Sequence, residues 1–220
     1  MERRGAATGM RTYPIMLDVR GRRAVVVGGG PVGLRKAQAL AAAGADVTLV
    51  AERLSSPRAP DGVAVLRAAY RPGVLAGAIL VLACTDDAAL NARIAADARA
   101  AGALANAADQ PEACDFFAPA VLRDGDVVVA VGTGGAAPAL AKHLRDRLAA
   151  AMPQRVGQFA ALLEALRGEV QASPADPARR GEVLRRLADD ETYAAFLAGG
   201  AEAVRGRLER LLRGPADRPR

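Results

Sequence analysis

Three glycines near the start of the chain have the spacing of a phosphate-binding turn. They fit G-x-G-x-x-G within "VVVGGGPVGLRKAQAL", residues 25–40, where a buried apolar run passes into a helical pattern. The first glycine permits a tight turn, the second lets a pyrophosphate approach the backbone, and the third lets helix and strand pack closely. Free N–H groups at the helix start add a partial positive charge. The alternative is a glycine turn without a ligand. The sequence predicts a dinucleotide site formed by Gly28, Gly29, Gly30, Pro31, Val32 and Gly33.

The choice between NAD and NADP depends on the end of the next predicted strand. Glu52 follows Gly33 by nineteen positions and is placed to accept a hydrogen bond from the ribose 2′-OH of NAD. Arg53 is adjacent and would instead suit the 2′-phosphate of NADP. Both residues can also be solvated loop charges. We expect NAD as the cofactor.

Two later segments also carry polar groups beside predicted strand ends or turns. "ACTDDAALN", residues 83–91, places Thr85 and Asp86 at the carboxyl end of a predicted central strand, where doubly wound sheets bind ligands. Asp86 can also serve as a helix N-cap. "GTGGAAPALAKHLR", residues 132–145, is a second glycine-rich turn leading into a helix that carries Lys142.

The elements that must position these residues alternate between strand and helix. Strand patterns cover 22–28, 46–51, 62–70, 77–85 and 103–109, and helical patterns cover 31–44 and 86–102. This alternation predicts a parallel sheet covered by helices on both faces.

The pattern changes after residue 115. Residues 116–135 hold two apolar runs separated by "RDGD", which is typical of a β-hairpin, and a helix is expected over 136–151. Helical patterns fill 154–213, with breaks expected at 172–177 and 198–200. We therefore predict an α/β fold in three parts: a Rossmann-like domain over 13–115, a hairpin-plus-helix domain over 116–152 and a helical domain over 153–213. Residues 1–12 and 214–220 are expected to be disordered.

Composition narrows the class of protein. The chain has 220 residues, 51% of them hydrophobic, and no apolar run long enough to span a membrane. The two cysteines are far apart, and no apolar run follows the basic N-terminus, so we expect a cytoplasmic protein without disulfides. Lys and Arg exceed Asp and Glu by 30 to 24, which fits either solvated charge or a polyanionic partner. With three Tyr, four Phe, no Trp and no DNA-binding motif, a nucleic-acid partner is not expected.

Four segments together resemble the precorrin-2 dehydrogenase family, which also forms the front module of siroheme synthase. They are "PIMLDVRGRRAVVVGGGPVGLRKAQAL", "CTDDAALN", "NAADQPEACDFFAP" and "GTGGAAPALAKHLRDRL", in this order over residues 13–153. The resemblance implies NAD-dependent oxidation of precorrin-2 to sirohydrochlorin in siroheme or cobalamin biosynthesis. It also implies a homodimer, in which we expect residues 116–151 to form most of the contact. The eight carboxylates of the substrate would account for an arginine-rich cleft.

The resemblance also assigns roles to residues. Asp109 matches the functionally important aspartate of the family and is the candidate general base, although a loop cap or a substrate-orienting group remains an alternative. Thr85 and Asp86 match the segment along the cofactor, and Cys114 is expected to be a packed thiol. The substrate-binding candidates are Asn106, which can instead shape the loop beside the nicotinamide, and Thr133, Gly134, Gly135 and Lys142. The chain departs from the family's "G-G-x-S-P" at Ala137, where no hydroxyl is available.

Two points stay open at this stage. Some family members also insert ferrous iron into sirohydrochlorin, and the sequence does not decide whether this chain is such a ferrochelatase. We expect no bound metal, because His143 is the only histidine and no residues have metal-site spacing; the tetrapyrrole nitrogens would be the ligands in a chelatase. The alternative function is an NAD(H)-sensing regulatory module without catalysis, in which the segments at 106–116 and 132–138 would have no role.

Overall fold

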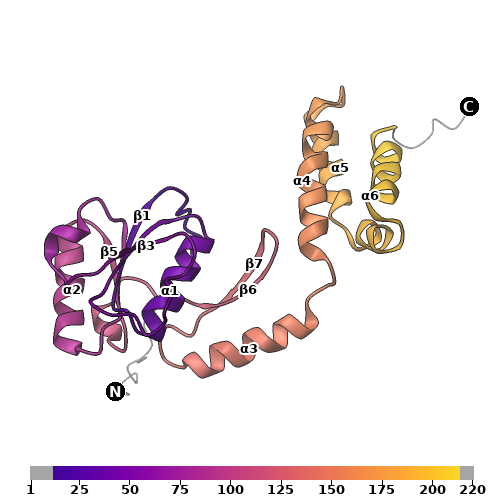
Figure 1. Ribbon diagram of the computed structural model, residues 1–220. Coiled ribbons are helices and arrows are strands. Elements are labelled where there is room, and N and C mark those ends of the chain that lie inside the picture. The colour runs from indigo at the N-terminus through magenta and orange to yellow at the C-terminus, as the bar shows by residue number, and fades with distance from the viewer. Residues whose placement is uncertain (1–11, 214–220) are drawn as a thin grey trace, which may run out of the picture. The chain divides into compact units, whose positions relative to one another are not determined.

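The computed structural model describes residues 12–213 and divides them into two compact units (Figure 1). The first contains residues 12–118 and 132–138, and the second contains 119–131 and 139–213. Each unit is described by itself. The disorder expected at the two ends concerns residues that, except for residue 12, lie outside the described part. The three domain boundaries drawn from the sequence stay predictions.

The first unit is a five-stranded, fully parallel sheet in the order β3-β2-β1-β4-β5. Chain order runs outward from β1 to β3 on one side and from β4 to β5 on the other, as in a Rossmann fold. Helices α1 and α2 lie on opposite faces of this sheet (Figure 1). The elements are β1 (Arg23–Val27), α1 (Pro31–Ala42), β2 (Asp46–Val50), β3 (Val63–Leu66), a 3-10 turn η1 (Pro72–Leu75), β4 (Leu80–Ala83), α2 (Ala88–Ala100), β5 (Leu104–Ala107) and a 3-10 turn η2 (Pro111–Ala113).

Small aliphatic side chains build the core of this unit. The inner strands β1 and β4 are buried along nearly their whole length, because a helix covers each face of a parallel sheet. Val26 and Leu49 pack on the α1 side, and Val25 and Ile94 pack on the α2 side. The predicted α/β fold class is therefore confirmed.

The second unit begins with an antiparallel hairpin, β6 (Ala120–Asp124) and β7 (Val127–Val131), followed by α3 (Pro138–Ala151). Three further helices, α4 (Val156–Ala172), α5 (Pro177–Leu187) and α6 (Asp190–Arg213), enclose a separate core around Leu166, Phe196 and Val204. The hairpin turn lies against the start of α4, where the Asp124 carboxylate accepts a hydrogen bond from the Gly157 N–H at 2.8 Å.

Several expected boundaries were wrong by a few residues. The strand expected over 62–70 is only β3, because Arg67–Tyr70 leave the sheet, and the helix expected from 86 starts at Ala88. The break expected at 198–200 does not end α6 but kinks it at Gly200, whose φ is 64°. A break that the sequence did not indicate separates α5 from α6 at Ala188 and Asp189.

Candidate functional site

The glycine loop joins β1 to α1 at the carboxyl edge of the sheet. Gly28 has φ 119°, and a Cβ there would collide with the backbone carbonyl of Cys84. A Cβ on Gly33 would collide with the carbonyl of Gly28, so this glycine is required for the close packing of helix against strand. Gly30 is the N-cap residue of α1, and nothing lies within 4 Å of a Cβ built on it. The helix start is thus open toward solvent at the residue where a pyrophosphate would approach.

The loop after β2 is fixed against this turn. The Ser55 N–H donates to the Gly29 carbonyl at 2.8 Å, and a Cβ on Gly29 would collide with the Arg53 carbonyl. Gly29 is therefore needed for packing of the two loops, whatever it contributes to a ligand. Glu52 and Arg53 are both exposed in this loop, so either side chain is free to meet a nucleotide ribose.

Thr85 lies just beyond β4 and is held by a residue that the sequence analysis missed. Asn91 of α2, only 2% exposed, accepts hydrogen bonds from the Thr85 N–H and hydroxyl through its Oδ1 and donates to the Thr85 carbonyl. A polar residue on the buried face of a helix was the available signal. The suggestion that Asp86 caps this helix was wrong: Asp87 is the N-cap, with its carboxylate accepting from the Leu90 N–H, and Asp86 stays exposed.

Asp109 lies in the loop after β5, two strands from the glycine loop. It is exposed and has φ 60°, a left-handed conformation that aspartate tolerates better than most residues. Among residues 12–213 its carboxylate has no hydrogen bond or ion pair, so it is free to accept a proton or to orient a substrate.

The ends of the Asp109 loop are tied together by buried polar groups. Asn106 is 6% exposed, and its Nδ2 donates to the Phe116 carbonyl at 2.9 Å and to Cys114 Sγ at 3.4 Å. The Asp115 carboxylate accepts from the Ala105 N–H and from Arg99. Since the amide group of Asn106 is engaged with the protein, the geometry favours the loop-shaping role of Asn106 over direct contact with a substrate.

Both cysteines are packed thiols. Burial raises the pKa of Cys84, and the nearby cations Lys36 and Arg35 only oppose that rise. Burial also raises the pKa of Cys114, whose sulfur contacts the backbone of Ala107. At neutral pH both thiols are protonated, which is unsuited to a nucleophile.

The second glycine-rich turn belongs to the first unit. Gly134 and Gly135 have φ values of 60° and 82°, and a Cβ on Gly135 would press on the ring of Phe117. The Thr133 hydroxyl accepts a hydrogen bond from the Ala137 N–H at 3.2 Å. The Thr133 hydroxyl thus helps to close this turn.

The last substrate-binding candidate belongs to the second unit. Lys142 and His143 are exposed residues of α3 in the second unit. In the described part of the chain, no group of three or more His, Cys, Asp or Glu side chains could hold a metal ion. No helix within 12–213 is long and apolar enough to cross a membrane.

Comparisons with known proteins agree with this geometry. Residues 15–120 match the family model described as "Putative NAD(P)-binding". The chain is 37% identical over 215 residues to a siroheme synthase of Chromobacterium violaceum, covering 95% of this chain and 46% of that protein. A siroheme synthase of Nitrosospira multiformis is 37% identical over 218 residues, with coverages of 96% and 46%. The chain therefore spans about half the length of the curated relatives it matches.

A solved structure confirms the fold over both units. SirC, a precorrin-2 dehydrogenase, superposes with a TM-score of 0.72 at 24% identity and covers 90% of this chain and 99% of its own. The resemblance to siroheme synthase and precorrin-2 dehydrogenase that the four motifs indicated is thus confirmed in sequence and in fold.

Proposed function

We propose that this chain, a homologue of the siroheme synthases over about half of their length, is an NAD-dependent dehydrogenase that converts precorrin-2 into sirohydrochlorin. The observation that carries the proposal is an exposed, unpaired carboxylate, Asp109, at the same sheet edge as an open glycine loop. Ligands bind at this edge of doubly wound sheets, where the strand order reverses. In this sheet the reversal lies between β1 and β4, and Gly28 contacts Cys84 at that point.

The residues present fit a dinucleotide. The open N-terminus of α1 at Gly30 would hold the pyrophosphate, and Thr85 would border the cofactor with its backbone fixed by Asn91. When bound, the nicotinamide supplies a hydride acceptor. The exposed Glu52, in a loop fixed against Gly29, supports NAD over NADP, because its carboxylate can accept from a ribose 2′-OH but repels a 2′-phosphate.

The chain's own chemistry is removal of a proton. Oxidation of precorrin-2 removes a hydride and a proton, and Asp109 is the proposed group that takes the proton from the tetrapyrrole. The turn at Gly134 and Gly135 and the exposed Lys142 would bind substrate carboxylates through N–H groups and charge. Both cysteines are free thiols, which suits the cytoplasmic location that is part of this proposal.

The test is an anaerobic incubation of the purified chain with precorrin-2 and either NAD⁺ or NADP⁺. We expect NADH and sirohydrochlorin to form in equal amounts, as monitored by absorbance. The value of kcat/KM should be higher with NAD⁺ than with NADP⁺. Binding of NAD⁺ without turnover of precorrin-2 would overturn the proposal and favour a nucleotide-sensing module.

Ferrous iron is a second substrate to be tested with the same protein. The similarity to siroheme synthases supports insertion of iron into sirohydrochlorin by this chain. The four tetrapyrrole nitrogens would be the metal ligands, so the reaction needs no protein metal cluster. Anaerobic addition of Fe²⁺ and sirohydrochlorin should form siroheme faster than the same mixture without protein; an equal rate would limit the chain to the dehydrogenase step.

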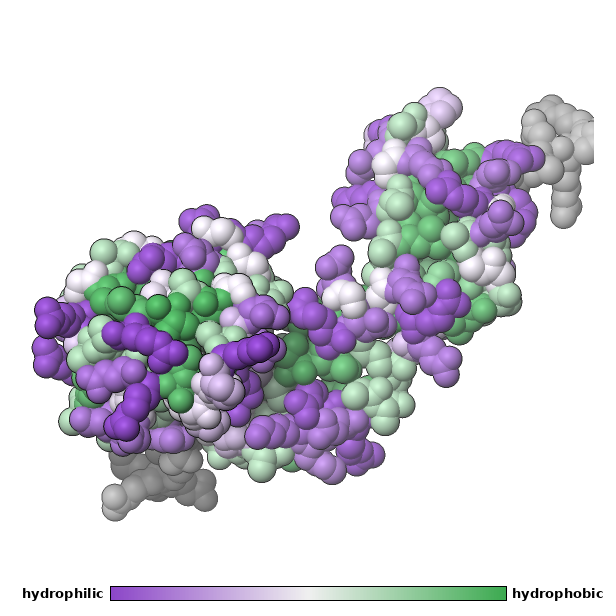
Figure 2. All heavy atoms as spheres, viewed as in Figure 1, coloured by the Kyte–Doolittle hydropathy of each residue, from purple (hydrophilic) through white to green (hydrophobic). Residues whose placement is uncertain are grey.

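We also propose a homodimer that forms mainly through residues 116–151. Leu140, Leu144 and Leu148 of α3 are 49%, 39% and 46% exposed and lie four residues apart, on one side of the helix. Figure 2 shows hydrophobic residues at the surface over the β6–β7 hairpin. A two-stranded hairpin is marginally stable by itself, and a second copy that covers it would supply the missing apolar contact.

A further inference from the structure

Lys36 makes a hydrogen bond that connects the helix after the glycine loop to a strand far away in the chain. It lies in the second turn of α1, and its ammonium group donates to Asn106 Oδ1 at 2.5 Å. The two residues are 70 positions apart, on α1 and β5. Within residues 12–213 no carboxylate lies at ion-pair distance from Lys36, so this cation is held by neutral groups, the Asn106 amide and the nearby Cys84 thiol.

The contact joins two parts of the proposed site. The helix that carries Lys36 begins at Gly30, where the pyrophosphate would bind. Asn106 closes the loop that carries Asp109, through its hydrogen bonds to Phe116 and Cys114. A single side chain therefore links the start of the nucleotide-binding helix to the loop with the proposed base.

We infer that Lys36 is a positioning residue, which holds Asn106 and thereby the Asp109 loop in the arrangement needed for proton removal. The inference rests on the proposed dehydrogenase function. It assigns no contact with the substrate to Lys36; the lysine acts through Asn106.

The physical reason is the orientation of the buried amide. Asn106 donates through Nδ2 toward Phe116, so its Oδ1 must point the other way and needs a donor. Lys36 supplies that donor, and a charged donor makes a stronger hydrogen bond than a neutral one. Without Lys36, the Asn106 Oδ1 has no hydrogen-bond donor at a buried position that water hardly reaches. The amide then lowers its free energy by rotating away from Phe116 and Cys114 to find another donor. The loop that carries Asp109 would then open more often.

The first test needs neither cofactor nor substrate. Cys114 lies at the end of the Asp109 loop, where its sulfur contacts Asn106 and Ala107. Burial raises the pKa of Cys114 and the charge of Lys36 opposes that rise, so the alkylation rate reports how often the loop opens once it is corrected for the thiolate fraction, which the pH dependence of the rate gives. In the free protein, Lys36→Met should raise the rate of Cys114 alkylation by iodoacetamide on the order of tenfold, measured on the separated peptide. Arg35→Met removes a charge from the adjacent, exposed position and should leave that rate unchanged. Equal rates in wild type and Lys36→Met would overturn the inference.

The second test uses turnover of precorrin-2 at saturating NAD⁺. Lys36→Met should lower kcat on the order of tenfold or more, leave the Kd for NAD⁺ within about twofold, and leave KM for precorrin-2 little changed. Lys36→Arg keeps a charged donor and should restore much of kcat, whereas Arg35→Met should behave as wild type. Lys36→Met combined with Asn106→Ala should be no slower than Asn106→Ala alone, because both act on one contact.

The outcomes separate this inference from the proposed function. A wild-type chain that does not oxidise precorrin-2 contradicts the function, while the alkylation test still decides the role of Lys36 in the loop. An active wild type with an equally active Lys36→Met contradicts the inference alone. If Asn106→Ala does not fold, the kcat values of Lys36→Met, Lys36→Arg and Arg35→Met are enough to test the role of Lys36. A fall in NAD⁺ affinity in Lys36→Met would also contradict the inference, since this result would place Lys36 in cofactor binding.

Discussion

At the scale of single residues, the glycines of the β1–α1 loop differ in what surrounds them. Gly28 and Gly33 are closed in by backbone carbonyls, so a methyl group there displaces the main chain. Gly30 has open space where a side chain would go. Only a substitution at Gly30 can therefore block a ligand and leave the fold intact.

Gly30→Asp should abolish NAD⁺ binding without unfolding the protein. The new carboxylate would stand beside the pyrophosphate, and such like-charge contact costs several kcal/mol, so Kd should rise on the order of 100-fold or more. Calorimetric titration measures Kd, and circular dichroism checks the fold. Gly28→Ala is the contrasting variant, expected to lower the thermal midpoint because its methyl group meets the Cys84 carbonyl. Normal NAD⁺ affinity in a folded Gly30→Asp would remove the loop from the site.

Substitutions of Asp109 distinguish a general base from a group that orients the substrate. If Asp109 takes the proton, Asp109→Asn should lower kcat on the order of 10²–10⁴-fold and leave the Kd for NAD⁺ unchanged. Asparagine suits this test because it tolerates the positive φ of residue 109, whereas alanine adds backbone strain. If Asp109 only orients the tetrapyrrole, Asp109→Asn should keep most of kcat and raise KM. Wild-type kinetics in Asp109→Asn would move the base to another residue or to solvent.

At the scale of helices and strands, the start of α4 depends on a residue from another element. Arg155, at the N-cap position of this helix, offers no side-chain cap, and Asp124 of the hairpin binds the Gly157 N–H instead. A Cβ on Gly157 would collide with the Asp124 carbonyl, so the hairpin turn and α4 fit together only with glycine there.

Two glycines of α4 should respond to alanine in opposite directions. Gly168→Ala meets open space and should stabilise the protein by up to about 1 kcal/mol, as expected from helix propensity. Gly157→Ala has the same propensity gain but must displace the hairpin backbone, and should destabilise by about 1–3 kcal/mol. Thermal unfolding, monitored by the circular dichroism signal of the helices, compares the stabilities of the two variants. A stabilised Gly157→Ala would contradict the close approach of hairpin and helix.

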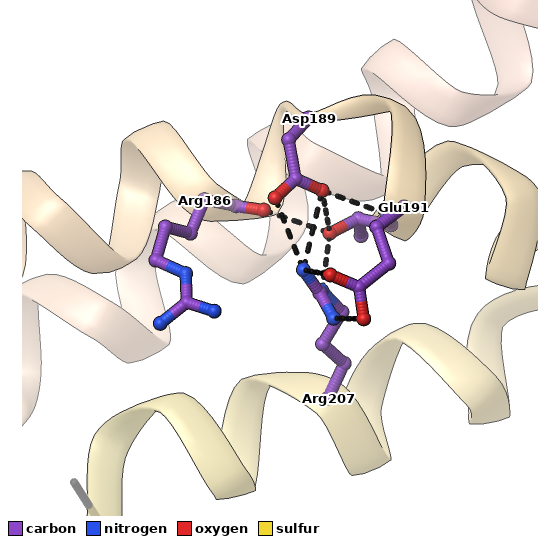
Figure 3. Close-up of polar contacts among 5 residues, drawn as sticks. Arg186, Asp189, Glu191 and Arg207 are labelled. Carbon is purple, nitrogen blue, oxygen red and sulfur yellow. Dashed lines mark hydrogen bonds and ion pairs between the residues drawn. The ribbon is translucent and has the colours of Figure 1, made fainter. Parts of the chain in front are cut away.

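A buried arginine in the second half of α6 binds the junction between α5 and α6 (Figure 3). Arg207 of α6 is 7% exposed and donates to the Thr192 hydroxyl at 2.6 Å and to the Asp189 carboxylate at 3.0 Å, and it forms an ion pair with Glu191. Burial acts to raise the pKa of Asp189, but hydrogen bonds from Thr192 and Arg207 outweigh it and leave the pKa lowered. The hydrogen bond from Arg207 lowers the pKa of Glu191.

These lowered pKa values give the network a pH-dependent share of stability. A carboxylate with a depressed folded-state pKa stabilises fully above its unfolded pKa of about 4, and that stability is lost as pH falls through the folded value. Arg207→Met should therefore lower the melting temperature at pH 7, and the difference from wild type should shrink as pH falls below about 4. Melting curves over this range, recorded by circular dichroism, measure the difference. A difference that is independent of pH would assign the loss to packing alone.

The same elements show what a sequence can and cannot predict. The strands were predictable because short apolar runs alternate with helical periodicity, and the glycine loop because its spacing has a steric cause. Lys36 and Asp124 were not, because each acts across a contact between segments far apart in the chain, and the neighbouring sequence does not identify the partner. Asn91 is detectable as a polar residue on the buried face of a helix, but the sequence does not show that it binds Thr85, six positions away. The end of α5 was missed because no glycine or proline marks it. The Thr192 hydroxyl donates to the Arg186 carbonyl in the last turn of α5, and the Asp189 carboxylate accepts from the Thr192 N–H at the start of α6.

At the scale of the whole molecule, the apolar surface of α3 is the feature that a lone chain does not explain. Only Ala141 is buried in this helix, although Leu140, Leu144 and Leu148 follow the four-residue spacing of a packed face. A helix that exposes such a stripe is expected to pack against a partner, and we propose a second copy of the chain.

Leu144→Asp should convert the proposed dimer into a monomer. A carboxylate at the centre of the stripe would be buried without a partner in the interface, which costs far more than its exposure in a single chain. Light scattering after size exclusion at micromolar concentration should give twice the 22.6 kDa chain mass for wild type and the chain mass itself for Leu144→Asp. Ala149→Asp introduces the same charge at an exposed position away from the stripe and should remain a dimer. If wild type elutes as one chain, or if both variants dissociate equally, the leucine stripe is not the contact, and the exposed face of α3 must serve another partner.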